Sequence, residues 1–398
     1  MQTSDRLNSL GGGVFARTDQ RKQAYRVDAE SGDRFPLIDL SLGSADLPPP
    51  QPVLDAISQA IHELSSSAYC LNAGTAPFQQ AVAEWCATRF GVDVDPQSEV
   101  QLLVGSQEGT AHLPLAVLNH GDPALVLDTC YPSHLGGVLL AGADVQRLSL
   151  SSADGWKPDL SMMSGSAWDR LKLFVFGYPH NPTAQVGDQR LLDAVMDRGV
   201  THDLVIAHDN PYVDLSLIGE APSLLRSCGW KECGIEFFSF SKAWCLGGIR
   251  LGFAVGAAPL ISALRQVKSV IDFNQSLALQ RGAITALRDY SDWPAALRPI
   301  YQDRRDSVLT ALQRMGWSVP PAEMAMYLWM PVPDWARARG WDDERCAAEL
   351  LRGCGVALTP GTGFGDGGRG WLRMALVQPV EVLVKAVDRL AGCRDSSL

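Results

Sequence analysis

The segment IEFFSFSKAWCLGGIRLGFAVG (235–256) contains two short apolar runs, IEFFSFS (235–241) and LGFAVG (251–256), with a lysine between them. Runs of this length that are rich in aromatic and β-branched residues predict β-strands. Similar runs precede the segment, separated by longer patterns of helical type: VQLLVG (100–105), ALVLD (124–128), LKLFVFG (171–177) and LVIAHD (204–209). This alternation predicts an α/β fold in which helices cover both faces of a mostly parallel sheet.

Polar or glycine-containing residues follow the predicted strands. In a mostly parallel sheet, ligands bind beyond the carboxyl ends of the strands. We therefore expect the functional site among the segments that follow them: Gly105-Ser106-Gln107, Asp128-Thr129, Gly177-Tyr178-Pro179, Asp209-Asn210 and Ser241-Lys242.

The 398 residues are enough for a large domain and a smaller one. After about residue 290 the pattern changes to a charged helix (301–315), a strand (326–332), a helix (342–355) and a final strand (371–377). This order predicts a smaller α+β domain at 291–398, after a large domain at 49–290. Residues 1–48 are predicted to form an N-terminal arm and part of the small domain, with the Pro-rich segment DLPPPQP (46–52) as a linker or turn.

The overall composition argues against several kinds of partner. A formal net charge of −10 would repel nucleic acid and anionic lipid surfaces. The start MQTSDRLNSL is polar, and no run approaches the roughly 18 apolar residues of a membrane span, so we expect a cytoplasmic protein. The nine cysteines include no C-x-x-C pair and the seven histidines no H-E-x-x-H motif, which predicts neither a disulfide framework nor a metal site.

Lys242 and Asp209 are the leading candidates for catalysis. A lysine in partly apolar surroundings can act as a nucleophile toward carbonyl groups, although a lone loop lysine is usually a surface residue. Ser239, Ser241 and Arg250 lie near Lys242 in the sequence and would supply donors and a positive charge for a phosphate. An ionised Asp209 at the end of a buried strand needs a cation or a strong donor, and the ring nitrogen of pyridoxal phosphate would provide one. An aspartate that caps a turn is an equally good interpretation.

Other residues at the predicted strand ends fit a planar, phosphorylated ligand. Tyr212 and Asn181 would hydrogen-bond a phenolic oxygen, and Tyr131 would stack on a ring, unless it is a packed aromatic beside a turn. The segment 105–110 precedes a predicted helix, whose free N–H groups favour an anion, although a plain helix cap fits as well. His134 would orient Asp209 from behind.

Arg373 is a positive charge inside an apolar predicted strand. A substrate carboxylate would satisfy it, and a structural ion pair is the alternative. The nearby GFGDGG (363–368) matches G-x-G-x-x-G but precedes a strand and opens no helix, so we reject a dinucleotide site there. A nicotinamide-dependent oxidoreductase rests on this motif alone and remains a rival, which the absorbance spectrum of the purified protein would settle.

The order of these motifs resembles that of the fold-type I, class I/II aminotransferases. The resemblance covers nearly the whole chain, through DLSLGSADLPPP (39–50), AYCLNAGTAPF (68–78), LLVGSQEGTAHLPLAVLNHGD (102–122), DTCYPSHLGG (128–137), YPHNPTA (178–184), HDNPYVDL (208–215), SFSKAWCLGGIRLGFAVG (239–256) and TPGTGFGDGGRGWLRMAL (359–376). Within the family, the chain is most similar to the LL-diaminopimelate aminotransferase-like enzymes of cyanobacterial type. The segment SKAWCLGG departs from the S-K-S-Y-N-M-G-G form that we expect there.

The resemblance implies a mostly parallel seven-stranded sheet, the cofactor pyridoxal 5'-phosphate (PLP) and a homodimer with active sites at the subunit interface. It implies a ping-pong exchange between a small amino acid and a 2-oxo acid, with LL-diaminopimelate and 2-oxoglutarate as the candidate pair. Lys242 would form the Schiff base and carry protons, and Asp209 would bind the ring nitrogen. Asn181 and Tyr212 would hydrogen-bond the phenolic oxygen, and Tyr131 would stack on the ring. Arg373 and the Gly43 N–H would bind the substrate α-carboxylate. The phosphate would be held by Ser106, Gln107, Ser239 and Arg250, together with Tyr69 of a neighbouring subunit.

Asp272, in VKSVIDFNQ (267–275), falls where aspartate aminotransferases place an arginine from the partner subunit for the distal carboxylate. An acid there would repel aspartate and favour a distal ammonium, whereas a solvated helix acid is the simpler interpretation. The alternatives are an aminotransferase of aspartate, alanine, aromatic or methionine/glutamine type, and a related PLP-dependent lyase or decarboxylase. A regulatory protein with an aminotransferase-like domain would need a basic DNA-binding segment, for which the arm leaves little room.

Overall fold

The computed structural model describes residues 3–10, 13–30, 35–69, 74–273 and 275–395. Within them, seven strands form one sheet in the order β2-β8-β7-β6-β5-β3-β4. The strands are β2 (Val100–Leu103), β3 (Pro123–Asp128), β4 (Asp144–Ser149), β5 (Leu173–Phe176), β6 (Val205–Asp209), β7 (Gly234–Ser239) and β8 (Gly252–Gly256). Only β8 is antiparallel to its neighbours in this sheet, so the predicted mostly parallel α/β sheet is confirmed.

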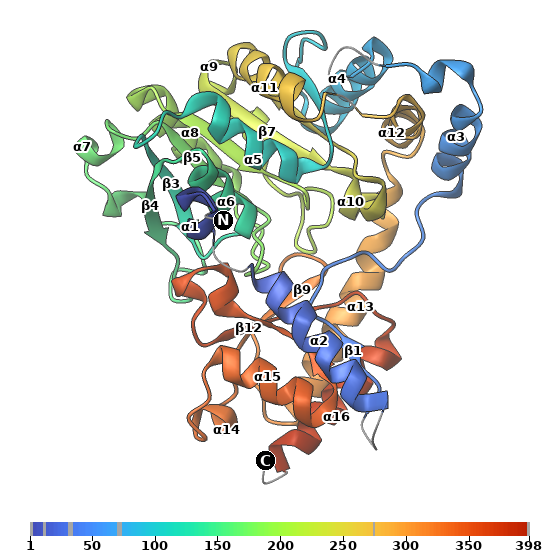
Figure 1. Ribbon diagram of the computed structural model, residues 1–398, viewed down its shortest axis with the longest axis vertical. Helices are drawn as coiled ribbons and strands as arrows, with labels where there is room; N and C mark the ends of the chain where they lie inside the picture. The colour runs from blue at the N-terminus through green and yellow to red at the C-terminus, as the bar shows by residue number, and fades with distance from the viewer. Residues whose placement is uncertain (1–2, 11–12, 31–34, 70–73, 274, 396–398) are drawn as a thin grey trace.

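Strand β5 shows why both faces of this sheet are covered. Its side chains alternate between two buried clusters, with Phe174 and Phe176 in one and Leu173 and Val175 in the other. The first cluster includes side chains of α4 (Ala76–Phe90) and α8 (Gln189–His202), and the second those of α5 (Ser106–Val117), α6 (Pro132–Leu140) and α11 (Ala258–Ile271). Helices therefore pack on both faces, as the apolar runs predict (Figure 1).

A second body of structure lies below the large sheet in Figure 1. It contains the antiparallel sheet β11-β12-β9 and the parallel pair β1-β10. Its elements are β1 (Ile38–Asp39), α13 (Trp293–Arg314), β9 (Tyr327–Pro331), α14 (Asp334–Arg337), α15 (Asp343–Cys354), β10 (Val356–Ala357), β11 (Thr359–Pro360), β12 (Trp371–Ala375) and α16 (Val380–Asp395). Strand β1 joins the N-terminal part of the chain to this body. The domain boundaries at 48/49 and 290/291 stay predictions.

Some elements differ from the pattern expected from the sequence. The edge strand β4 was not anticipated, because its side chains are largely exposed and it lacks an apolar run. The N-terminal arm contains two helices, α1 (Asp5–Ser9) and α2 (Val14–Glu30), and α16 follows the last predicted strand. The run 235–241 stops being a strand at Ser239, and Lys242 lies in the short helix α10 (Phe240–Ala243).

The remaining α-helices are α3 (Gln51–Ile61), α7 (Gly165–Trp168), α9 (Trp230–Cys233) and α12 (Leu277–Asp289). The GFGDGG sequence lies in two 3-10 turns before β12 and opens no helix of a βαβ unit. Across the described ranges, none of the helices is long and apolar enough to cross a membrane.

Candidate active site

A cavity of about 250 Å³ lies where five strands of the large sheet end and the smaller body meets them. Strands β2, β3, β5, β6 and β7 run in the same direction, so their carboxyl ends share one edge of the sheet. Eleven of the residues predicted for the site line this cavity: Gly43, Ser106, Gln107, Tyr131, Asn181, Asp209, Tyr212, Ser239, Lys242, Arg250 and Arg373. The structure thus brings together most of the residues selected from separate motifs.

Lys242 reaches the cavity because α10 begins directly after β7. Ser239 caps this helix, with its hydroxyl accepting from the Ser241 N–H at 3.1 Å. The ammonium nitrogen of Lys242 donates to the backbone carbonyl of Gly43. A side chain at Gly43 is excluded, because a Cβ there would lie 1.8 Å from the hydroxyl oxygen of Tyr327. Gly43 therefore lets the backbone approach both the lysine and this tyrosine.

Asp209 ends β6 with a buried carboxylate. Its Oδ2 lies 3.1 Å from Nε2 of His134, which agrees with the orienting role predicted for that histidine. Its Oδ1 is buried and has no hydrogen-bond partner among the described residues. A buried carboxylate oxygen without a donor is costly. The geometry leaves this atom free for an N–H group of a ligand in the cavity.

Three polar groups meet between the large sheet and β9. Asn181 Nδ2 donates to the Tyr212 hydroxyl at 3.4 Å, and that hydroxyl lies 3.1 Å from the hydroxyl of Tyr327. Burial raises the pKa of Tyr212 well above its usual value. Burial also acts to raise the pKa of Tyr327, but the positive charges of Lys242 and Arg373 lower it. Tyr212 is therefore the better permanent donor of the two.

Arg373 is 1% exposed and lies in β12. Its Nη1 donates to Asn181 Oδ1 at 2.8 Å and its Nη2 to the Ser41 carbonyl at 2.8 Å, whereas its Nε has no partner in the described part of the chain. The guanidinium carbon lies 5.4 Å from the ring centre of Phe15 and 4.4 Å from that of Tyr327. Its partners among the described residues are an amide and a carbonyl oxygen and not a carboxylate, so the alternative of a structural ion pair is not seen among them.

The opposite end of the cavity is a cradle for an anion. Helix α5 begins at Ser106 after Gly105, whose φ of 81° suits glycine. A Cβ on Gly105 would lie 2.5 Å from Arg250 Nη2, so glycine also lets the guanidinium approach the helix start. The Tyr131 hydroxyl donates to Gln107 Oε1 at 3.4 Å. Free N–H groups, the helix dipole and a guanidinium together favour a phosphate.

Tyr69 and Asp272 do not line the cavity of their own chain. Tyr69 is 83% exposed and its ring lies 6.1 Å from that of Phe273. Asp272 follows α11, and its Oδ1 lies 2.9 Å from Nζ of Lys268. Both roles require a partner subunit, so they stay predictions.

Two aromatic lining residues were not anticipated from the sequence, Phe15 and Tyr327. Tyr327 lies in a continuous apolar strand and Phe15 in a charged helix, and neither stands in a motif of its own. The exclusion of a side chain at Gly43 is the signal that reveals Tyr327, but it exists only in three dimensions.

Comparison with known proteins identifies the family. The family model for aminotransferase class I and II matches residues 36–390. The chain belongs to this aminotransferase family. It is 37% identical over 392 residues to the LL-diaminopimelate aminotransferase of Moorella thermoacetica, an alignment that covers 98% of each chain.

Solved aminotransferases have the same fold. A probable N-succinyldiaminopimelate aminotransferase from Thermus thermophilus matches with a TM-score of 0.88 and 38% identity, covering 96% of this chain and 100% of that chain. The aspartate aminotransferase from Thermus thermophilus with maleate matches with a TM-score of 0.89 and 26% identity, covering 99% and 100%. The predicted fold type I is confirmed. The chain is an aminotransferase, and PLP is its cofactor, as in other class I aminotransferases.

Proposed function

We propose that this aminotransferase moves an amino group between LL-diaminopimelate and 2-oxoglutarate by a ping-pong mechanism. 2-Oxoglutarate becomes glutamate when it accepts the group. The unpartnered Oδ1 of Asp209, in one cavity with Lys242 and Arg373, carries the assignment of the site. Full-length relatives that are 33–37% identical and are named LL-diaminopimelate aminotransferase support the substrate.

The residues of the cavity fit PLP. Asp209 would pair with the ring nitrogen through its free Oδ1, while His134 holds the other oxygen. Asn181 and Tyr212 would hold the phenolic oxygen, and Tyr131 would lie against the ring. Ser106, Gln107, Ser239 and Arg250 would hold the phosphate at the start of α5. When bound, PLP supplies an electron-accepting ring that stabilises negative charge at the substrate α-carbon.

Lys242 is the residue that attaches the cofactor and moves protons. Its amine would remove the proton from the substrate α-carbon as a general base and would then deliver it to the aldehyde carbon of the cofactor. The Gly43 carbonyl holds this amine near the cavity. Tyr212 remains protonated because burial raises its pKa, so it acts as a donor rather than as a second base.

Arg373 would clamp the substrate α-carboxylate. Two of its N–H groups are already held by Asn181 and Ser41, which fix the guanidinium plane. Arg373 lines a cavity with aromatic walls, where a carboxylate gains more from a charge-assisted pair than in water. The Gly43 N–H would contact the same carboxylate.

We also propose a homodimer in which Tyr69 and Asp272 of the partner subunit complete each site. Exposed apolar side chains lie near both residues in the sequence: Ile61, Leu64, Val270, Ile271 and Phe273. Leu64 is 91% and Val270 83% exposed, which suits a covered surface better than a solvated one. Asp272 would then favour a substrate with a distal ammonium over aspartate. The cytoplasmic location predicted from the sequence stays a prediction.

A panel of amino acids tests the substrate. The holoenzyme is mixed separately with LL-diaminopimelate, N-succinyl-LL-diaminopimelate, glutamate, aspartate, alanine and phenylalanine, and the visible spectrum is recorded. LL-diaminopimelate and glutamate should convert the cofactor from its aldehyde form to its amine form, with glutamate formed when 2-oxoglutarate is added. Conversion by aspartate but not by LL-diaminopimelate contradicts the proposed substrate, and product without glutamate indicates a lyase.

A further inference from the structure

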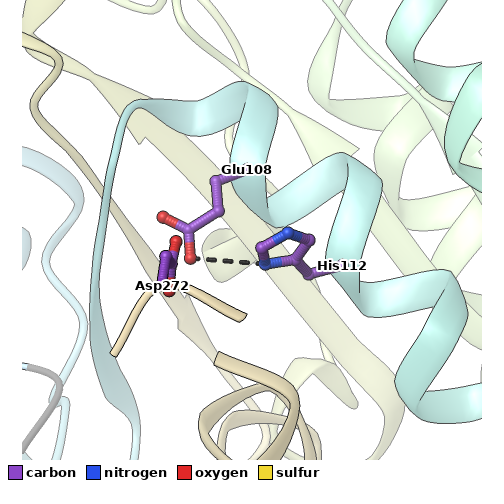
Figure 2. Close-up of side chains that lie close together, drawn as sticks. All are labelled: Glu108, His112 and Asp272. Carbon is purple, nitrogen blue, oxygen red and sulfur yellow. Dashed lines mark ion pairs between the residues drawn. The ribbon is translucent and has the colours of Figure 1, made fainter. Parts of the chain in front are cut away.

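A buried group of charged residues lies directly behind the anion cradle. Glu108, in the first turn of α5, has its Oε1 2.8 Å from Nζ of Lys268, which is fully buried on α11. The same ammonium lies 2.9 Å from Asp272 Oδ1. His112, one turn along α5, has its Nδ1 3.4 Å from Glu108 Oε1. Figure 2 shows Glu108, His112 and Asp272 close together, with the first two on one helix.

The spacing of these groups resembles that of metal ligands, but a cation is already present. One ligand atom each of Glu108, His112 and Asp272 lies within 4.8 Å of the others. The ammonium of Lys268 contacts both carboxylates at hydrogen-bond distance. A metal ion would have to displace this buried charge or bear its repulsion. The ammonium of Lys268 therefore takes the place that a metal ion would occupy.

This group is connected to both sides of the cradle. Glu108 Oε2 accepts a hydrogen bond from the Val104 N–H, which ties the side chain to the turn that precedes Ser106. Beyond the end of α11, the Gln275 amide donates to the Arg250 carbonyl. Residues of α11 and of the segment that follows it are thus connected by hydrogen bonds both to the turn before α5, through Glu108, and to Arg250.

Glu108 poses an electrostatic problem at this position. Burial acts to raise its pKa, but His112 and Lys268 lower the pKa to about 2, so the carboxylate is ionised at neutral pH. An ionised acid one residue after Gln107 would oppose a phosphate at the same helix start. The hydrogen bond to Val104 nevertheless requires an acceptor there. The positive charge of Lys268 lets Glu108 remain as the acceptor for Val104 while reducing its repulsion of a phosphate.

We propose that Lys268 is a positioning residue for the cofactor phosphate: its ammonium, which also contacts Asp272, offsets the charge of Glu108 and keeps that side chain bonded to the turn 104–107. This inference rests on the proposed role of the cradle in holding the phosphate of PLP. It adds to that role a residue that touches neither cofactor nor substrate.

The test compares PLP with pyridoxal, which lacks the phosphate. Holoenzyme is resolved from its cofactor and titrated with each compound, for the wild type, Lys268→Met and the double variant Lys268→Met/Glu108→Gln. Lys268→Met should weaken PLP by about tenfold or more, the scale of an uncompensated charge near an anion, and pyridoxal by less than about twofold. The double variant should recover PLP affinity to within about threefold, because glutamine still accepts from Val104 without a charge.

Lys231→Met is the matched control. Lys231 forms a 2.9 Å pair with Glu99, which precedes β2, whereas the cavity lies beyond the other end of that strand. This control should leave both affinities unchanged.

Three results would overturn the inference: equal losses for PLP and pyridoxal in Lys268→Met, no loss for either, or a double variant that binds PLP no better than the single one. If Lys268→Met does not fold, the double variant alone tests the inference. A PLP affinity near that of the wild type would support it, and a tenfold loss of PLP affinity would refute it. A wild type that binds PLP and pyridoxal equally would instead refute the proposed phosphate site itself.

Discussion

Replacing Arg373 by lysine isolates the proposed carboxylate clamp. The guanidinium is 1% exposed and already gives N–H groups to Asn181 and to the Ser41 carbonyl, both at 2.8 Å. Lysine keeps the charge, but its single ammonium is not able to hold these two acceptors and a substrate carboxylate in one plane. Hydrogen bonds to charged groups contribute about 1.5–3 kcal/mol each. Losing one or two of them at the carboxylate should cost about 3 kcal/mol, or about a hundredfold in kcat/KM.

The assay for Arg373→Lys is the first half-reaction, followed by the visible spectrum over a range of LL-diaminopimelate concentrations. A primary amine without the α-carboxylate serves as the matched substrate and should react about equally with both enzymes. PLP affinity should not change, because Arg373 is not placed at the phosphate. Equal losses for the amino acid and the amine, or a loss below about threefold for the amino acid, refute the clamp.

Two further predictions concern the walls of the site, and a third concerns the buried Glu108 behind it. Gly43→Ala would place a Cβ 1.8 Å from the Tyr327 hydroxyl, so kcat should fall more than about tenfold at full cofactor content; unchanged kcat contradicts the close packing. His134→Asn removes the partner 3.1 Å from Asp209 Oδ2, and the pH midpoint of the cofactor spectrum should move by more than about half a unit; an identical midpoint argues against its orienting role. Despite burial, which raises it, the pKa of Glu108 is lowered from 4.5 to about 2, so the stability contributed by this group is present above pH 4.5 and is lost as the pH falls toward 2. In urea titrations Glu108→Gln should therefore lose less free energy of unfolding over that range than the wild type, and equal losses contradict the assignment.

The large sheet could be predicted because its inner strands are buried on both faces. Such strands are continuous apolar runs, and β5, β6 and β7 were predicted on that basis. Strand β4 differs because it lies at the sheet edge and is mostly exposed, so its sequence DVQRLS contains little apolar signal. Helix α2 is rich in charged residues and lacks a strong apolar face, which hides it from periodicity.

Some residues of the site could likewise be predicted from the sequence, and others could not. Lys242, Asp209 and Arg373 stand out locally, because each is a charge at the end of, or within, an apolar strand. Tyr327 has no such mark and enters the cavity only because β9 passes close to Gly43. The pair of Glu108 and Lys268 is separated by 160 residues and depends on the packing of α5 against α11.

The measurement that tests the account most directly is the spectrum and turnover of Lys242→Ala. The phosphate cradle should still retain PLP, but the visible absorbance of the lysine-bound cofactor should be absent. Transfer from LL-diaminopimelate to 2-oxoglutarate should fall at least about a thousandfold, because the variant lacks the base that moves the α-proton. Turnover within tenfold of the wild type would contradict the central role of Lys242.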